Sequence, residues 1–139
     1  MITPSLGRAS SPGRMESAAS PFLDPVVIEN LVQALTRIDR LADLGSYWEV
    51  KQELEALPPA ARELPAVQLR VGRMLESLDR VEEALALYAG MDRSSLSQLG
   101  YVRCLARLER VEEARTLLDR IPFDAALVKE FVEARDLVC

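Results

Sequence analysis

The chain has 139 residues, of which 49% are hydrophobic and 28% are charged. This composition suits one soluble domain, or one short repeat array, with an apolar core. A net charge of −5 disfavours nucleic acid and anionic membranes as partners, because both require a basic surface.

Two Cys and no His leave neither a disulfide framework nor an imidazole base nor a metal-ligand spacing. We therefore expect no catalysis, no metal and no cofactor. The apolar runs are far too short to span a membrane, and the N-terminus lacks the apolar stretch of a secretory signal. These features predict a cytoplasmic protein.

Residues 1–24 are rich in Ser, Pro, Gly and Ala and show no helical period. Such a segment cannot bury enough apolar surface to offset the entropy of ordering, which predicts a disordered tail. Two alternatives stay open: an organelle transit peptide, and a chain that starts at Met15.

The remainder, 25–139, is dominated by Ala, Leu, Glu and Arg, which favour helices, and no segment alternates as a half-buried strand does. Asp24 and Pro25 suit the start of a first helix. Apolar spacing and Gly or Pro breaks predict helices at about 25–44, 47–57, 65–78, 81–90, 96–108, 111–121 and 124–137. The sequence therefore predicts an all-α fold.

Two segments of the chain are nearly the same. "DRVEEALALYAGM" starts at Asp79 and "ERVEEARTLLDRI" starts at Glu109. A third, weaker copy starts at Leu44. Leu44 aligns with the leucines that precede the other two segments, Leu78 and Leu108, and the three leucines are 34 and 30 residues apart. A period in this range predicts stacked helix pairs, because one pair cannot cover its own apolar face. The pairs would span about 25–58, 65–92 and 95–122.

The middle pair carries Val71-Gly72, Leu75, Ala84 and Tyr88 in the order of the tetratricopeptide pattern. The chain thus resembles tetratricopeptide-repeat proteins over roughly residues 25–122. The third pair departs from the pattern with Val102 at the Gly position, and the first departs more. The resemblance implies a right-handed superhelix of three helix pairs, with helix 124–137 capping the last pair. The alternatives are an ordinary helical bundle with one duplication, and a last helix that binds a partner.

In that family the first helices of successive pairs line a concave groove. The resemblance implies a partner-binding groove here at Val32, Leu35, Asp39, Leu69, Arg73, Glu76, Leu99 and Arg103. A row of leucines beside arginines suits an amphipathic helix with acidic flanks. In the alternative interpretation the groove is closed and the leucines belong to the core. If the groove is open, Leu69→Glu or Arg103→Glu abolishes partner binding and preserves helicity.

Several further residues are expected to have structural rather than functional roles. Cys104 lies on the packed side of its helix, which indicates an inert thiol. Trp48 is expected to pack between helix pairs. The paired glutamates Glu82-Glu83 and Glu112-Glu113 start helices and are expected to face solvent.

We therefore expect a small protein-binding adaptor or chaperone whose groove sequesters an apolar helix of a partner. The partner segment could be helical or extended. In layout the chain is similar to small type III secretion chaperones of the needle-subunit type, which implies a hetero-oligomer with a small secreted or co-chaperone protein. The alternative is a scaffold that self-associates end to end through its terminal helices.

Overall fold

A computed structural model of the chain describes residues 24–91 and 93–139. Apart from Asp24, the expected tail lies outside the described residues. The chain divides into two compact units, residues 1–37 and residues 38–139. No strand occurs in the described ranges, so the predicted all-α class is confirmed. None of the described helices is both long and apolar enough to cross a membrane.

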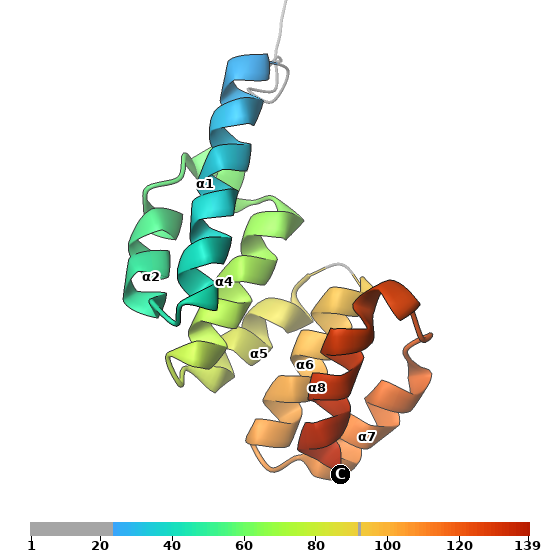
Figure 1. Ribbon diagram of the computed structural model, residues 1–139. Coiled ribbons are helices and arrows are strands. Elements are labelled where there is room, and N and C mark those ends of the chain that lie inside the picture. Colours follow the sequence, from blue (N-terminus) through green and yellow to red (C-terminus); the bar gives the residue numbers. More distant parts are fainter. Residues whose placement is uncertain (1–23, 92) are drawn as a thin grey trace, which may run out of the picture. The chain divides into compact units, whose positions relative to one another are not determined.

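The helices follow the expected order (Figure 1). Their bounds are α1 Pro25–Asp43, α2 Tyr47–Glu55, α3 Pro59–Arg62, α4 Pro65–Ser77, α5 Val81–Ala89, α6 Ser95–Arg107, α7 Val111–Arg120, the 3-10 turn η2 Ala125–Leu127, and α8 Val128–Val138. Among the elements of the described residues, the four-residue α3 and the turn η2 were not predicted.

The start of α1 shows why the sequence begins a helix there. The Asp24 carboxylate accepts a hydrogen bond from the backbone N–H of Val26 at 2.9 Å. Pro25, which has no N–H to satisfy, occupies the first helical position. The predicted cap is thus confirmed.

Three turns that follow α1, α4 and α6 have the same backbone structure. In each, a residue with positive φ follows the anchor leucine: Gly45 (76°), Asp79 (63°) and Glu109 (64°). The next N–H then reaches back five residues along the preceding helix, from Ser46 to the Leu41 carbonyl (2.9 Å), from Arg80 to Leu75 (2.8 Å) and from Arg110 to Leu105 (2.9 Å). This is the Schellman type of helix end. The repeated phrases therefore encode a repeated turn as well as a repeated helix.

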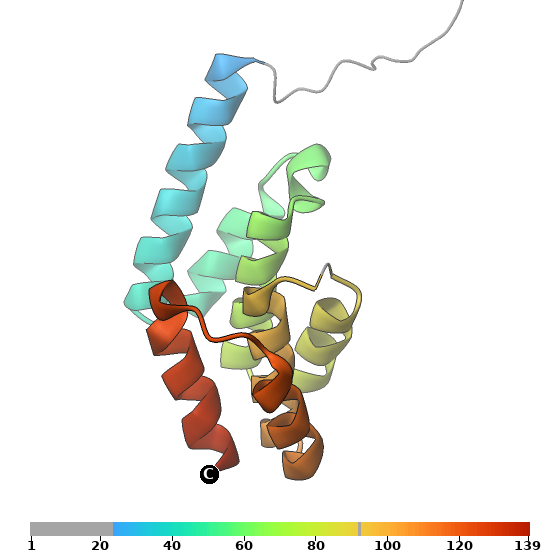
Figure 2. The same cartoon turned by 90° about the vertical axis from the view of Figure 1, so that its right-hand side faces the viewer.

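The core of the second compact unit centres on α6, which contacts α5, α7 and α8. Figure 2 shows α6 between α5 and α8. The buried residues of this core are Leu99, Val102, Leu105, Ala114, Ile121, Ala134 and Val138. Ala84 on α5 and Ala114 on α7 have no exposed surface. These small residues allow the close approach that the repeat predicts.

Two single residues test the expected packing. Cys104 is fully buried, as predicted. Trp48 is 69% exposed, so the expectation that it packs between helix pairs is wrong. It opens α2 on the outward side of that helix, and Lys51 Nζ lies 6.0 Å from the centre of its ring.

Candidate binding site between α4, α6 and α8

The strongest candidate for a functional site is a slot within the second compact unit. It has a volume of about 200 Å³ and is lined by Leu69, Arg70, Arg73, Tyr88, Leu96, Arg103 and Glu130. Residues 69, 70 and 73 come from the middle of α4, while Leu96 and Arg103 come from α6. Glu130 on α8 completes the wall. The slot therefore combines apolar side chains with guanidinium groups.

A buried ion pair links the two helices that form most of the slot. Arg103 on α6 donates from Nε to Glu76 Oε1 and from Nη2 to Oε2, both at 3.0 Å. The Tyr88 hydroxyl donates to the same Oε2 at 2.7 Å. Arg107 adds a bond to the Glu76 backbone carbonyl at 2.8 Å. Both Glu76 oxygens are thus satisfied, as a buried carboxylate requires.

The ionisation of this cluster follows from its burial and its pairing. Burial by itself lowers the pKa of Arg103, but the hydrogen bonds and charge of Glu76 outweigh it and the pKa is raised. Burial, followed by the nearby Glu76 charge, raises the pKa of Tyr88 far above its usual value. The same two causes raise the pKa of the Cys104 thiol to about 12. The thiol is therefore protonated and inert near neutral pH.

The position of Tyr88 depends on two glycines. A Cβ on Gly72 of α4, or on Gly100 of α6, would lie 2.5 Å from Tyr88 Cζ. The ring thus fits between α4 and α6 only because both positions lack a side chain. Tyr88 and the Glu76–Arg103 pair together fix the spacing of these helices beneath the slot.

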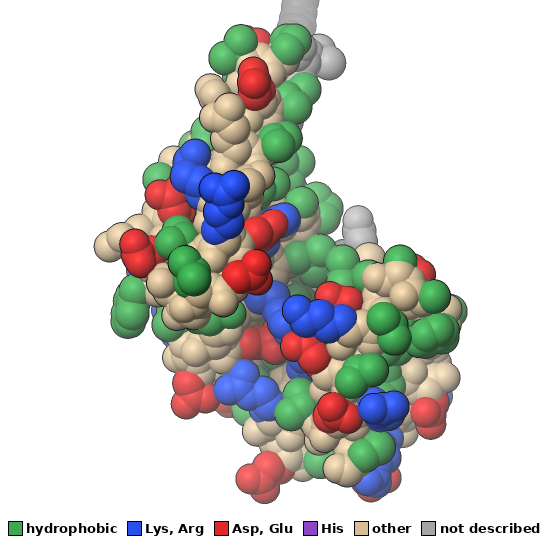
Figure 3. Space-filling view, viewed as in Figure 1, with side chains coloured by type: hydrophobic (Ala, Val, Ile, Leu, Met, Phe, Trp, Pro, Cys, Tyr) green, Lys and Arg blue, Asp and Glu red, His purple; other side chains and the backbone are tan. Residues whose placement is uncertain are grey.

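Ion pairs at the rim of the slot are more exposed. Arg70 makes a two-pronged contact with Asp39 at 2.8 and 2.9 Å. Arg73 on α4 reaches Glu133 on α8 at 3.3 and 3.4 Å. Side chains of both signs gather around the hollow beside α8 (Figure 3). Because exposed pairs of this kind contribute only about 0–1 kcal/mol, a competing carboxylate could replace Glu133 at little cost.

The structure separates the residues expected in the groove into several groups. Leu69, Arg73 and Arg103 line the slot. Asp39 holds Arg70 at its rim. Leu99 and Glu76 are buried, Leu99 in the core beneath α8 and Glu76 in the ion pair. In this conformation neither offers surface to a partner. Val32 and Leu35 belong to the first compact unit, and their place in a groove stays a prediction.

Four lining residues were not singled out from the sequence as groove residues: Arg70, Leu96, Tyr88 and Glu130. Leu96 lies one helical turn before Leu99, so the same apolar period contained the signal. Glu130 could not be found in this way, because the sequence does not show which face of α8 turns towards α4.

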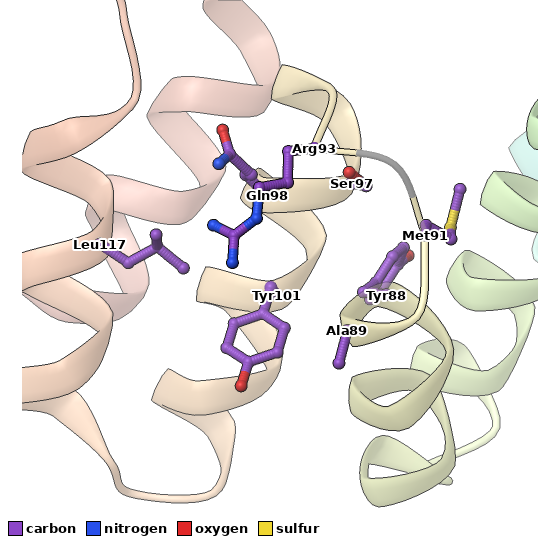
Figure 4. A pocket seen from close by; sticks show the side chains of 8 residues that line it. All are labelled: Tyr88, Ala89, Met91, Arg93, Ser97, Gln98, Tyr101 and Leu117. Atoms are coloured by element: carbon purple, nitrogen blue, oxygen red, sulfur yellow. The ribbon is translucent and has the colours of Figure 1, made fainter.

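A second hollow lies at the ends of α5 and α6 and has a volume of about 320 Å³. Its lining is Tyr88, Ala89, Met91, Arg93, Ser97, Gln98, Tyr101 and Leu117. Tyr101 and Arg93 lie between Leu117 and the α5 residues (Figure 4). Among these lining side chains Arg93 is the charged one, and Tyr88 is the lining residue shared with the slot.

The chemistry available to both hollows is binding through apolar, amide, hydroxyl and guanidinium groups. Within the described ranges no three His, Cys, Asp or Glu side chains are grouped to hold a metal ion. Comparison with protein-family models, with curated proteins and with solved structures gives no match.

Proposed function

We propose that this chain is a protein-binding helical-repeat adaptor or chaperone whose slot takes one face of an amphipathic helix. One observation carries the proposal: apolar Leu69 and Leu96 line an open slot beside Arg73. The Arg73 guanidinium is nearly half exposed, and its ion pair among the described residues is with Glu133, at 3.3 Å. An apolar stripe with a neighbouring carboxylate would satisfy both features.

The repeat supports a right-handed superhelix of helix pairs as the scaffold of that slot. Three identical turns recur at the spacing of the anchor leucines. The tetratricopeptide-like Gly72 provides the space that Tyr88 fills. Both features are what stacked, equivalent helix pairs require.

The helix α8 indicates what kind of partner the slot accepts. Its own Glu133 reaches Arg73, and its Glu130 lines the slot. The two glutamates lie three residues apart, on one side of a helix. A partner helix with the same acidic spacing beside a leucine stripe would compete for the same arginines.

Among possible partners, we propose a self-assembling helical subunit as the first class to test. This follows from the similarity in layout to small type III secretion chaperones. Masking the apolar stripe of such a subunit would block its premature assembly, and a small secreted or co-chaperone protein would complete a hetero-oligomer.

A synthetic helix provides a direct test of the slot. The probe is a fluorescent amphipathic peptide with leucines on one face and glutamates flanking them, measured by fluorescence anisotropy. We expect Leu69→Glu to weaken binding at least 10-fold, because it places a carboxylate in the apolar part of the slot. Leu44→Glu is the matched control, since Leu44 is 78% exposed and does not line the slot.

Charge reversal tests the role of Arg73. Arg73→Glu should weaken the glutamate-flanked peptide and strengthen a lysine-flanked peptide of the same apolar sequence. Circular dichroism verifies that each variant stays helical. Equal binding of both peptides by the native chain and by both slot variants would refute the proposal.

A further inference from the structure

The last helix has one buried and one uncovered face. Ala134 and Val138 are buried against α6 and α7, and Arg115 Nε of α7 donates to the Val138 carbonyl at 3.0 Å. On the opposite side, Val128 is 51% exposed and Val132, one turn later, is 38% exposed. These two valines form a short apolar stripe on the outside of α8.

An exposed aromatic residue also lies beside α8. Phe123, just before η2, is 67% exposed, and its ring centre lies 5.1 Å from that of Phe131 on α8. We call these three exposed apolar residues the α8 face: Phe123, Val128 and Val132. In a stack of helix pairs, a second helix would cover such a face, as α7 covers α6.

The charges beside the stripe are arranged so that the face complements itself. Lys129 and Asp136 are both exposed and lie seven residues apart, so two turns place them on the same side of α8. Within the described residues Lys129 makes no ion pair, and Asp136 meets only its neighbour Arg135, at 3.4 Å. One positive and one negative charge thus flank Val132 at nearly equal distances along the helix.

We propose that a second copy of this chain packs on the α8 face, with the two α8 helices antiparallel about a two-fold axis beside Val132. The Val132 side chains of the two copies meet at the centre. Lys129 of each copy then faces Asp136 of the partner subunit, twice by symmetry. The dimer is independent of the slot, because none of the residues that line the slot belongs to the α8 face.

Charge complementarity favours a second copy over a different protein. In an antiparallel pair of helices related by a two-fold axis, a residue N-terminal to the axis in one copy lies opposite a residue C-terminal to the axis in the other copy. Two like charges at these positions would repel each other, whereas Lys129 and Asp136 attract. The helix has 11 residues and a length of only about 16 Å. Stable interfaces bury at least about 1,000 Å², which is more than a helix face of this length provides. We therefore expect a weak dimer with a Kd on the order of 10–100 µM.

Sedimentation equilibrium of the full chain, in a reductant that keeps Cys139 from forming disulfides, tests the dimer across about 1 to 500 µM. Lys129→Glu alone and Asp136→Lys alone each create two like-charge contacts, and each should raise the dimer Kd at least 10-fold. An equimolar mixture of the two variants should recover the native Kd, because each copy then faces opposite charges. The double variant should recover it as well.

Val132→Glu, verified as folded by circular dichroism, should leave the chain monomeric. A native chain that is monomeric throughout this range overturns the proposal. So does a dimer whose Kd is unchanged by Val132→Glu, or single variants that the mixture fails to rescue. Binding of the helical peptide to the slot should be the same in all these variants, which separates failure of the dimer from failure of the proposed function.

Discussion

The Tyr88 side chain is confined both by packing around its ring and by a hydrogen bond from its hydroxyl. Its ring lies between two helix positions without side chains, and its hydroxyl is held by Glu76. Because the hydroxyl is anchored, the ring cannot rotate away from a new methyl group without losing that bond. Packing and hydrogen bonding at this residue therefore depend on each other.

Gly100→Ala should destabilise the fold by about 1–3 kcal/mol, because the new Cβ would lie 2.5 to 2.7 Å from three atoms of the Tyr88 ring. Gly90→Ala is the matched control. A Cβ there meets nothing closer than 3.7 Å and the backbone φ is −87°, so we expect no loss of stability. Urea unfolding followed by circular dichroism measures both. Equal effects of the two substitutions would show that the ring is not confined.

The buried ion pair leads to a prediction that differs from the one made for an open groove. Arg103→Glu now places two carboxylates against each other in a buried site, so we expect loss of folding rather than loss of binding alone. The milder Arg103→Met should cost about 3–5 kcal/mol, because it leaves Glu76 buried without its counter-charge.

A second substitution distinguishes this charge effect from loss of packing. In the double variant Arg103→Met with Glu76→Gln, no net charge is buried, and the amide can still accept from Tyr88. Its unfolding free energy should exceed that of Arg103→Met alone. A double variant that is less stable than either single variant would contradict this explanation.

At the scale of the element, the three Schellman turns differ in how well their residues suit them. Gly45 adopts positive φ without strain, whereas Asp79 and Glu109 adopt it at a cost. Asp79 receives some compensation from Arg107 at 3.3 Å. No such contact is found for Glu109 within the described residues.

Glu109→Gly should therefore stabilise the protein by about 0.5–1 kcal/mol, as relief of strain exceeds the added entropy of the unfolded chain. Gly45→Ala should destabilise it by about 1 kcal/mol for the opposite reason. Thermal unfolding measures the two shifts. A lower Tm for Glu109→Gly would mean that the carboxylate has a role that the turn geometry does not show.

The helix bounds were predictable where Pro or Gly residues stand at the helix ends. Pro65, Gly90 and Pro122 delimit elements whose observed bounds differ from the expected ones by only a few residues. The helix α3 escaped prediction because four residues are too few to show a period. The turn η2 escaped because Asp124 caps it through the Ala126 N–H, at 2.9 Å, just as it would cap a regular helix.

At the scale of the whole molecule, apolar periodicity identifies the inward face of each helix but not the element that covers it. Leu69 and Leu99 occupy equivalent positions in the repeat. Yet Leu69 lines the slot, while Leu99 is buried in the core that α8 completes. The Glu76–Arg103 pair shows the same limit, because two polar residues on separate helices carry no signal that they meet. The sequence thus predicted the helices and their spacing better than the site.

Removal of α8 distinguishes a stack of helix pairs from an ordinary bundle. A chain that ends at residue 122 loses the cover over Leu99 and the buried Ala134 and Val138. In a stack, stability is a sum of contacts between neighbours, so the loss should remain local. Amide hydrogen exchange should then accelerate most in α6 and α7 and least in α2, which makes no substantial contact with α8. A chain lacking only Cys139 is the control. A uniform rise in exchange through every helix would indicate one cooperative core and exclude the stacked arrangement, since in a bundle the loss of one helix weakens all the others together.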